Sequence, residues 1–122
     1  PLHRRGFKQA VGKAPLRETM AAIFLRECGY DGHEPVVDPM CGSGTLVIEA
    51  AEIAAGLAPG RARSFAFETF AGFDPDRWAA MRAEAGPRTG APCHVGYDRD
   101  AGMVRLAARN AEAFRRILEQ IQ

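Results

Sequence analysis

The sequence predicts an α/β fold built on a parallel sheet, and three features indicate it. A short apolar segment at residues 35–38 is predicted to form a strand that ends in an acid, and a glycine-rich loop follows at residues 39–44. An apolar helix is predicted for residues 45–55. A second strand, residues 93–97, ends at Asp98 and leads into a helix over residues 101–121. This order of strand, loop, helix, strand and helix is typical of parallel α/β sheets.

The first helix precedes the first strand. It is predicted to begin near Pro15, because proline suits the first helical position, and to end at Gly29. Its apolar residues recur at helical spacing, which predicts that they share the face turned toward the core. These residues are Leu16, Met20, Ile23, Phe24 and Cys28.

The last helix is long and amphipathic, and Asp100 is predicted to cap its N-terminus. The spacing of its apolar residues predicts an inner stripe along one face. That stripe consists of Val104, Ala107, Ala111, Phe114, Leu118 and Ile121.

Residues 57–92 interrupt the alternation of strands and helices and are predicted to be an insertion. Its aromatic run, residues 65–73, is interpreted as packing within the insertion, with stacking on nucleic-acid bases as the alternative. Asp74 followed by Pro75 predicts the cap and first turn of a helix that continues to about Ala85. The chain is therefore divided into segments 1–34, 35–56, 57–92 and 93–122 of one domain or part of one.

Composition limits the classes of protein further. The chain of 122 residues has a formal net charge of +1, which by itself demands no nucleic-acid partner, although basic residues crowd its first segment. No run approaches the length of a membrane span. The three cysteines are widely spaced without a Cys-x-x-Cys motif, so neither disulfides nor a metal site is expected and a cytoplasmic location is the default.

The glycine loop is the most informative segment. A turn between a strand and a helix lets a ligand approach the main chain, and the helix N-terminus attracts an anionic group such as a phosphate or a carboxylate. A nucleotide triphosphatase would need a lysine after Gly44, where Thr45 stands. A dinucleotide-binding fold would need a third glycine at Val47 and an acid about 20 residues on, which falls in the insertion. A plain structural turn is the remaining alternative, and the two acids at the strand ends, Asp38 and Asp98, argue against it.

At these residues the chain resembles the RNA methylase family of the UPF0020 type, which includes the bacterial large-subunit ribosomal RNA guanine-N2 methyltransferases. The resemblance runs through several motifs in order. They are residues 2–8, 14–19, 38–51, 65–68 with Trp78, and 96–100. It implies a Rossmann-like fold that binds S-adenosylmethionine, here truncated to the N-terminal cofactor-binding half, in a bacterial cytoplasmic protein.

The resemblance also implies roles for individual residues. The backbone around Gly42, Ser43 and Gly44 would hold the methionine end of the cofactor, with the amides at the helix start facing its carboxylate. Asp38 would accept from the ammonium and shape the loop, while Asp98 would take both ribose hydroxyls. Packing beside the site is the expected role of Met40 and Cys41. The implied cofactor-binding residues are Asp38, Pro39, Met40, Gly42, Ser43, Gly44, Thr45, Asp98 and, on the first helix, Thr19.

The resemblance further implies an RNA partner, with Arg4, Arg5 and Lys8 in contact with RNA or with the rest of the family's core. The family's amine-activating motif, Asn/Asp-Pro-Pro-aromatic, is absent, because Asp74-Pro75-Asp76-Arg77 has one proline and no aromatic residue at its fourth position. No catalytic residue is therefore expected in this chain. A partial sheet leaves an unpaired edge, so either self-association or a missing partner segment is expected.

Two other functions stay open at this point. One is a fragment of a DNA adenine-N6 methyltransferase, whose amine-activating motif is similar. The other is a non-catalytic scaffold or RNA-contact module that binds no cofactor.

Overall fold

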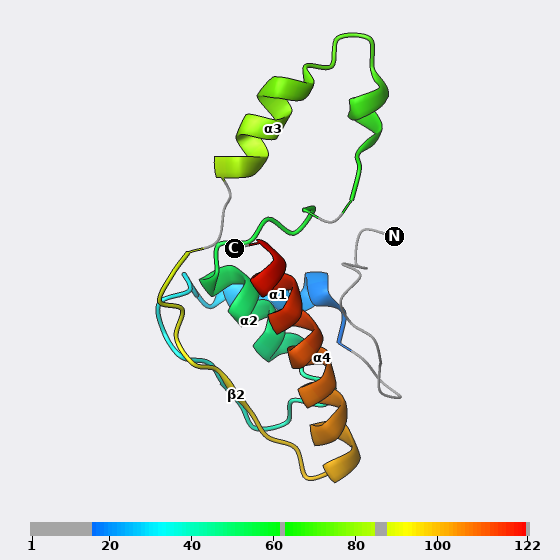
Figure 1. Ribbon diagram of the computed structural model, residues 1–122. Coiled ribbons are helices and arrows are strands. Elements are labelled where there is room, and N and C mark those ends of the chain that lie inside the picture. The colour runs from blue at the N-terminus through cyan, green and yellow to red at the C-terminus, as the bar shows by residue number, and fades with distance from the viewer. Residues whose placement is uncertain (1–15, 62, 85–87, 122) are drawn as a thin grey trace.

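The computed structural model describes residues 16–61, 63–84 and 88–121, without the side chains of residues 117, 120 and 121. Helices and strands follow one another in the predicted order (Figure 1). They are α1 (Glu18–Glu27), β1 (Val37–Asp38), α2 (Thr45–Ala54), the short 3-10 helix η1 (Ala66–Thr69), α3 (Pro75–Glu84), β2 (Val95–Gly96) and α4 (Ala101–Ile121). The α/β class predicted from the sequence is confirmed.

The two strands pair in parallel, with Val37 opposite Val95 and Asp38 opposite Gly96. The amide of Val95 donates to the carbonyl of Val36 at 2.9 Å, and that of Tyr97 donates to Asp38 at 2.8 Å. This ladder is shorter than the predicted strands, because the amide of Val36 donates to His94 Nδ1 at 3.0 Å instead of to the main chain. Since the strands are parallel, the residues that follow them, including Asp98, meet at one edge of the sheet.

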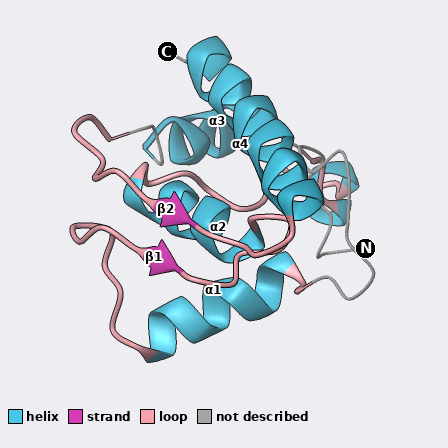
Figure 2. Ribbon diagram, turned by 90° about the horizontal axis from the view of Figure 1, so that it is seen from below, coloured by secondary structure: helices cyan, strands magenta, loops and turns pink. Residues whose placement is uncertain are grey.

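Helices α1, α2 and α4 lie together in a layer beside the strands, with α2 in contact with both of the others (Figure 2). The core between α2 and α4 contains Ile48, Ala55, Leu57 and Phe114, all buried. Leu57 was assigned to the insertion by the sequence, but its side chain belongs to this core. Within the described ranges, none of the helices combines the length and the apolar character needed to span a bilayer.

The predicted core face of α1 is wrong. The buried residues are Ala21 and Leu25, whereas Leu16, Met20, Ile23 and Phe24 are 37–48% exposed and Cys28 is also exposed. Helix α1 packs against α2 through the side that carries the small Ala21. The larger apolar face of α1 is left uncovered. The predicted end of α1 is confirmed, because Gly29 has a φ of +78° and its amide donates to Arg26. The predicted start at Pro15 lies outside the described residues.

The inner stripe of α4 is also partly wrong. Phe114 is buried and Leu118 packs beside it as predicted, but Val104 is 42% exposed and Ala111 is exposed. The other buried positions are Leu106 and Asn110. The buried face is therefore rotated relative to the predicted stripe, and it includes the polar Asn110, whose side chain donates to the Ser43 carbonyl in the interior. The side chain of Ile121 lies outside the described residues.

The insertion projects from the helical layer as a separate lobe that carries η1 and α3 (Figure 1). The predicted cap of α3 is confirmed, since Asp74 Oδ1 accepts from the amide of Arg77 at 3.0 Å. Two contacts tie the base of the lobe to the C-terminal end of α2. Arg61 donates to both carboxylate oxygens of Glu52, at 3.0 and 3.3 Å, and the amide of Arg88 donates to Ala55 at 2.7 Å.

Candidate functional site

The glycine loop connects the end of β1 to the start of α2. Gly44 is the N-cap of α2 and has a φ of +84°, and Gly42 has a φ of +53°. The amide of Gly44 donates to the carbonyl of Cys41 at 2.8 Å, which closes a tight turn. Because a glycine cap has no side chain to bind the first amides of the helix, the start of α2 is suited to an anionic ligand group.

The two loop glycines serve different needs. A Cβ on Gly44 would lie 3.2 Å from the Cβ of Ala107 on α4, so this glycine allows the helix to pack closely against the loop. A Cβ on Gly42 would meet no atom within 4 Å. Gly42 is therefore needed for its positive φ and not for close packing. It faces open space, where a bound molecule would find the main chain accessible.

Asp98, at the end of β2, reaches back to the loop. Its Oδ2 accepts from the amide of Gly42 at 3.0 Å and its Oδ1 accepts from the amide of Asp100 at 2.8 Å. These backbone hydrogen bonds hold the pKa of the Asp98 carboxyl below its usual range. Each oxygen of an ionised carboxylate can accept more than one bond, so Asp98 keeps acceptor capacity for a ligand. The sequence indicated the acid but not its bond to the loop.

Asp38 shapes the other side of the turn. Its Oδ1 accepts from the amide of Met40 at 2.9 Å, two residues further along the chain. The amide of Cys41 donates to the carbonyl of Tyr97 at 2.7 Å and thereby connects the two strand ends. The structure thus brings Asp38, the glycines and Asp98 together at one edge of the sheet.

The other predicted site residues occupy varied positions. Ser43 and Thr45 are buried, and their hydroxyl oxygens lie 3.4 Å apart. Pro39 and, on the first turn of α1, Thr19 are exposed. The expected packing role of Met40 is wrong, because its side chain is 82% exposed. The ligand contacts of all these residues stay predictions, and Arg4, Arg5 and Lys8 lie outside the described residues.

Cys41 lies in the loop but is unsuited to act as a nucleophile. Burial and the nearby carboxylates of Asp38 and Asp98 raise the pKa of its thiol. The Cβ and Sγ of Cys41 occupy the space beside Gly96, where an added Cβ would come within 2.9 Å. Its role in packing is therefore confirmed.

Asn110 is the part of the site that sequence reasoning missed. Its side chain on α4 is fully buried, and its Nδ2 donates to the carbonyl of Ser43 at 3.0 Å. The only signal in the sequence was an asparagine within an otherwise apolar helix face. Asp100, by contrast, acts as predicted, since its Oδ1 accepts from the amides of Gly102 and Met103 at the start of α4.

The aromatic residues of the lobe pack mainly on one another. Phe65 stacks on Phe67 with ring centres 5.3 Å apart, and Trp78 meets both rings edge-on. The ring centres of Phe73 and Phe67 lie 6.1 Å apart, whereas Phe70 is 66% exposed. The interpretation of the run as internal packing is confirmed for these residues except Phe70.

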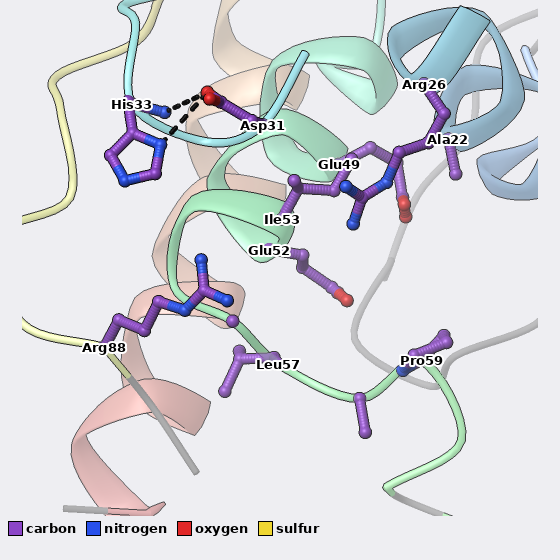
Figure 3. Close-up of a pocket in the computed structure, with 12 residues that line it drawn as sticks. Ala22, Arg26, Asp31, His33, Glu49, Glu52, Ile53, Leu57, Pro59 and Arg88 are labelled. Carbon is purple, nitrogen blue, oxygen red and sulfur yellow. Dashed lines mark hydrogen bonds and ion pairs between the residues drawn. The ribbon is translucent and has the colours of Figure 1, made fainter. Parts of the chain in front are cut away.

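A pocket of about 550 Å³ lies away from the glycine loop, at the opposite end of α2 (Figure 3). Its lining includes the buried carboxylates of Glu49 and Glu52, together with Arg26 and Arg88. Glu52 is paired with Arg61, so this pocket holds the anchor of the lobe and none of the predicted ligand-binding residues. In the described part of the chain, no three His, Cys, Asp or Glu side chains gather in a way that would hold a metal ion.

Curated relatives resemble nearly the whole chain. The Ribosomal RNA large subunit methyltransferase K/L of Vibrio parahaemolyticus is 45% identical over 117 residues, which are 90% of this chain and 16% of the relative. The protein of the same name from Alcanivorax borkumensis is 46% identical over 120 residues, covering 92% of this chain and 17% of its own length. The chain thus spans about a sixth of the curated relatives it matches.

Solved structures share the fold. A predicted N6-adenine-specific DNA methylase from Listeria monocytogenes matches with a TM-score of 0.75 and 40% identity, over 93% of this chain and 30% of that one. SMU.472, described as "a putative methyltransferase" and solved in complex with SAH, matches with a TM-score of 0.77 and 36% identity, over 98% of this chain and 31% of that one. The Rossmann-like methyltransferase fold expected from the sequence is thereby confirmed. The family model of UPF0020, the RMKL-like methyltransferase domain, matches residues 5–120, and the chain belongs to this family.

Proposed function

We propose that this chain is the S-adenosylmethionine-binding portion of an RNA methyltransferase, with guanine N2 of ribosomal RNA as the target of the whole protein. The observation that carries the proposal is the hydrogen bond between Gly42 and Asp98, which unites the glycine loop and the second acid in one site. The relative solved with SAH, the demethylated cofactor, supports the choice of ligand. The relatives named ribosomal RNA methyltransferases support the choice of substrate.

The arrangement of the residues fits the cofactor. The amides at the start of α2 suit its carboxylate, and the space beside Gly42 admits a ligand to the main chain. Asp38 would accept from the ammonium, and the remaining acceptor capacity of Asp98 would take the ribose hydroxyls. The other residues proposed around the ligand are Pro39, Met40, Ser43, Gly44, Thr45 and Thr19. The bound cofactor would supply the activated methyl group.

Methyl transfer needs a further group that accepts the hydrogens of the target amine. The nearest sequence match to the amine-activating motif is Asp74-Pro75-Asp76-Arg77, at the start of α3 in the projecting lobe. There the carboxylate of Asp74 caps the helix by accepting from the amide of Arg77. This segment is therefore committed to helix capping and not to amine activation. We propose that residues outside these 122 perform the chemical step.

A second candidate function is methylation of adenine N6 in DNA. It is favoured by one observation, the name of the Listeria monocytogenes relative as a predicted N6-adenine-specific DNA methylase. RNA and DNA substrates offered to the whole protein with radiolabelled cofactor would distinguish the two, since label would enter only one of them.

The proposal extends to partners and location. We propose that the whole protein is cytoplasmic and that it contacts RNA through Arg4, Arg5 and Lys8. Self-association through the sheet is supported by the exposed apolar residues of the two strands, Val37 at 60% and Val95 at 37%. Sedimentation of this chain at several concentrations would test this last point.

The test of cofactor binding is calorimetric titration with S-adenosylmethionine of the unaltered chain, of Asp98→Ala and of Asp76→Ala. Asp76 is an exposed acid on α3 and serves as the matched control. Asp98→Ala should weaken binding by roughly five- to a hundredfold, because a charged acceptor is lost, and Asp76→Ala should not change it. A folded, unaltered chain that binds no ligand at millimolar concentration would refute the proposal and favour the scaffold function.

A further inference from the structure

We infer that Asn110 is a positioning residue, which holds the glycine loop in the conformation that receives the cofactor without contacting the cofactor itself. The inference rests on the proposed function, because it concerns the same site. Asn110 is separated from Ser43 by 67 positions in the sequence, yet its Nδ2 lies 3.0 Å from the Ser43 carbonyl oxygen. Its side chain is 0% exposed, so water does not compete for this bond.

Three consecutive loop residues are held from outside the loop. The amide of Cys41 donates to Tyr97, the amide of Gly42 donates to Asp98, and the carbonyl of Ser43 accepts from Asn110. The first two bonds come from the end of β2. The third bond comes from α4, through Asn110. It holds Ser43, which lies just before the N-terminus of α2.

The bond acts on the turn through the rigid peptide unit. The carbonyl of Ser43 and the amide of Gly44 belong to one planar group and point in opposite directions. By fixing the Ser43 carbonyl, Asn110 therefore also fixes the Gly44 amide, which closes the turn by donating to Cys41 at 2.8 Å. Without this donor the peptide unit is free to rotate, because glycine tolerates many backbone conformations.

A purely structural role in helix packing predicts different behaviour. Phe114 lies one turn further along α4, is 6% exposed, and packs with Ile48, Ala55 and Leu57 in the core between α2 and α4. If Asn110 only stabilised the contact of α4 with α2, its replacement would resemble replacement of Phe114. Phe114→Leu is therefore the matched control for Asn110→Leu, which keeps the size of the side chain but removes the donor.

The experiment measures the dissociation constant of S-adenosylhomocysteine by calorimetry at a temperature where each variant is folded by circular dichroism. Asn110→Leu should weaken binding about tenfold, the equivalent of one lost hydrogen bond, while Phe114→Leu should lower the melting temperature and leave the affinity within about twofold. If the unaltered chain binds but Asn110→Leu binds equally well, or weakens no more than Phe114→Leu, the positioning role is overturned while the proposed function stands. If the unaltered chain does not bind, the proposed function itself fails.

A second measurement needs no ligand and applies even if Asn110→Leu folds poorly. Asn110→Ala leaves space for a water molecule beside Ser43 and is the milder change. Amide hydrogen exchange in the ligand-free chain should be faster at Gly44 in this variant than in the unaltered chain, with exchange in the rest of α2 unchanged. Equal exchange at Gly44 in both proteins would contradict the role of Asn110.

Discussion

The glycine-loop edge and the projecting lobe are stabilised in different ways. At the edge, side chains of Asp98 and Asn110 bind main-chain groups of the loop, at 3.0 Å in each case. In the lobe, aromatic rings pack on one another, and the guanidinium of Arg63 lies 4.3 Å from the centre of the Phe65 ring. Hydrogen bonds fix directions, whereas ring packing mainly fills volume. A site that must present amides to a ligand therefore needs the first kind of stabilisation, and an insertion can be built with the second.

The largest expected effect is at Gly44. Gly44→Ala should destabilise the chain by about 2–4 kcal/mol, because a left-handed conformation and overpacking each carry a cost. The added methyl would lie 3.2 Å from Ala107 at a φ of +84°. Gly42→Ala is the control, since its φ is also positive but its Cβ would meet no neighbour. It should cost only about 1 kcal/mol, the conformational part of the penalty.

Urea unfolding followed by circular dichroism would measure both free energies. Equal losses for the two variants would show that close packing of α4 on the loop contributes nothing to stability.

A smaller effect is expected from pH, through His94. Burial lowers the pKa of His94, and its Nδ1 accepts from the amide of Val36, which requires the neutral ring. The unfolded chain, with a histidine pKa of about 6.5, therefore binds a proton more readily than the folded chain. Stability should be fully present above that pH and should fall as the pH is lowered through it.

Denaturant midpoints between about pH 7.5 and pH 5.5 would measure this dependence, a window centred on the ordinary histidine pKa. His94→Asn should flatten the dependence in this window, and the same substitution at the exposed His33 is the matched control. A slope that persists in His94→Asn would assign the effect to other groups.

The smallest effect is expected in the lobe, at Trp78. Its Nε1 is buried and has no hydrogen-bond partner among the described residues. Trp78→Phe therefore breaks no described hydrogen bond and should cost less than about 1.5 kcal/mol, the usual upper range for a tolerated apolar exchange. Affinity for S-adenosylhomocysteine should not change, because the lobe projects away from the helical layer (Figure 1). A marked loss of affinity would mean that the two regions are coupled.

Much of the chain was predictable because its signals are local. The caps at Asp74 and Asp100 and the helix end at Gly29 follow from residue types that satisfy nearby amides and carbonyls. The pairing of two acids with a glycine loop followed from the order of elements, since parallel strands end at the same edge. The core faces of α1 and α4 were not predictable in this way.

The sequence by itself determined the order of the elements, their caps and the glycine loop with its two acids, because these depend on residues close together in the chain. The tertiary structure alone decided which face of each helix is buried. Periodicity shows that Ile23 and Phe24 lie near each other on α1, but not whether another element covers them, and here they are 46% and 48% exposed. Asn110 is buried for the same kind of reason, since an acceptor 67 residues away, the Ser43 carbonyl, compensates the loss of water.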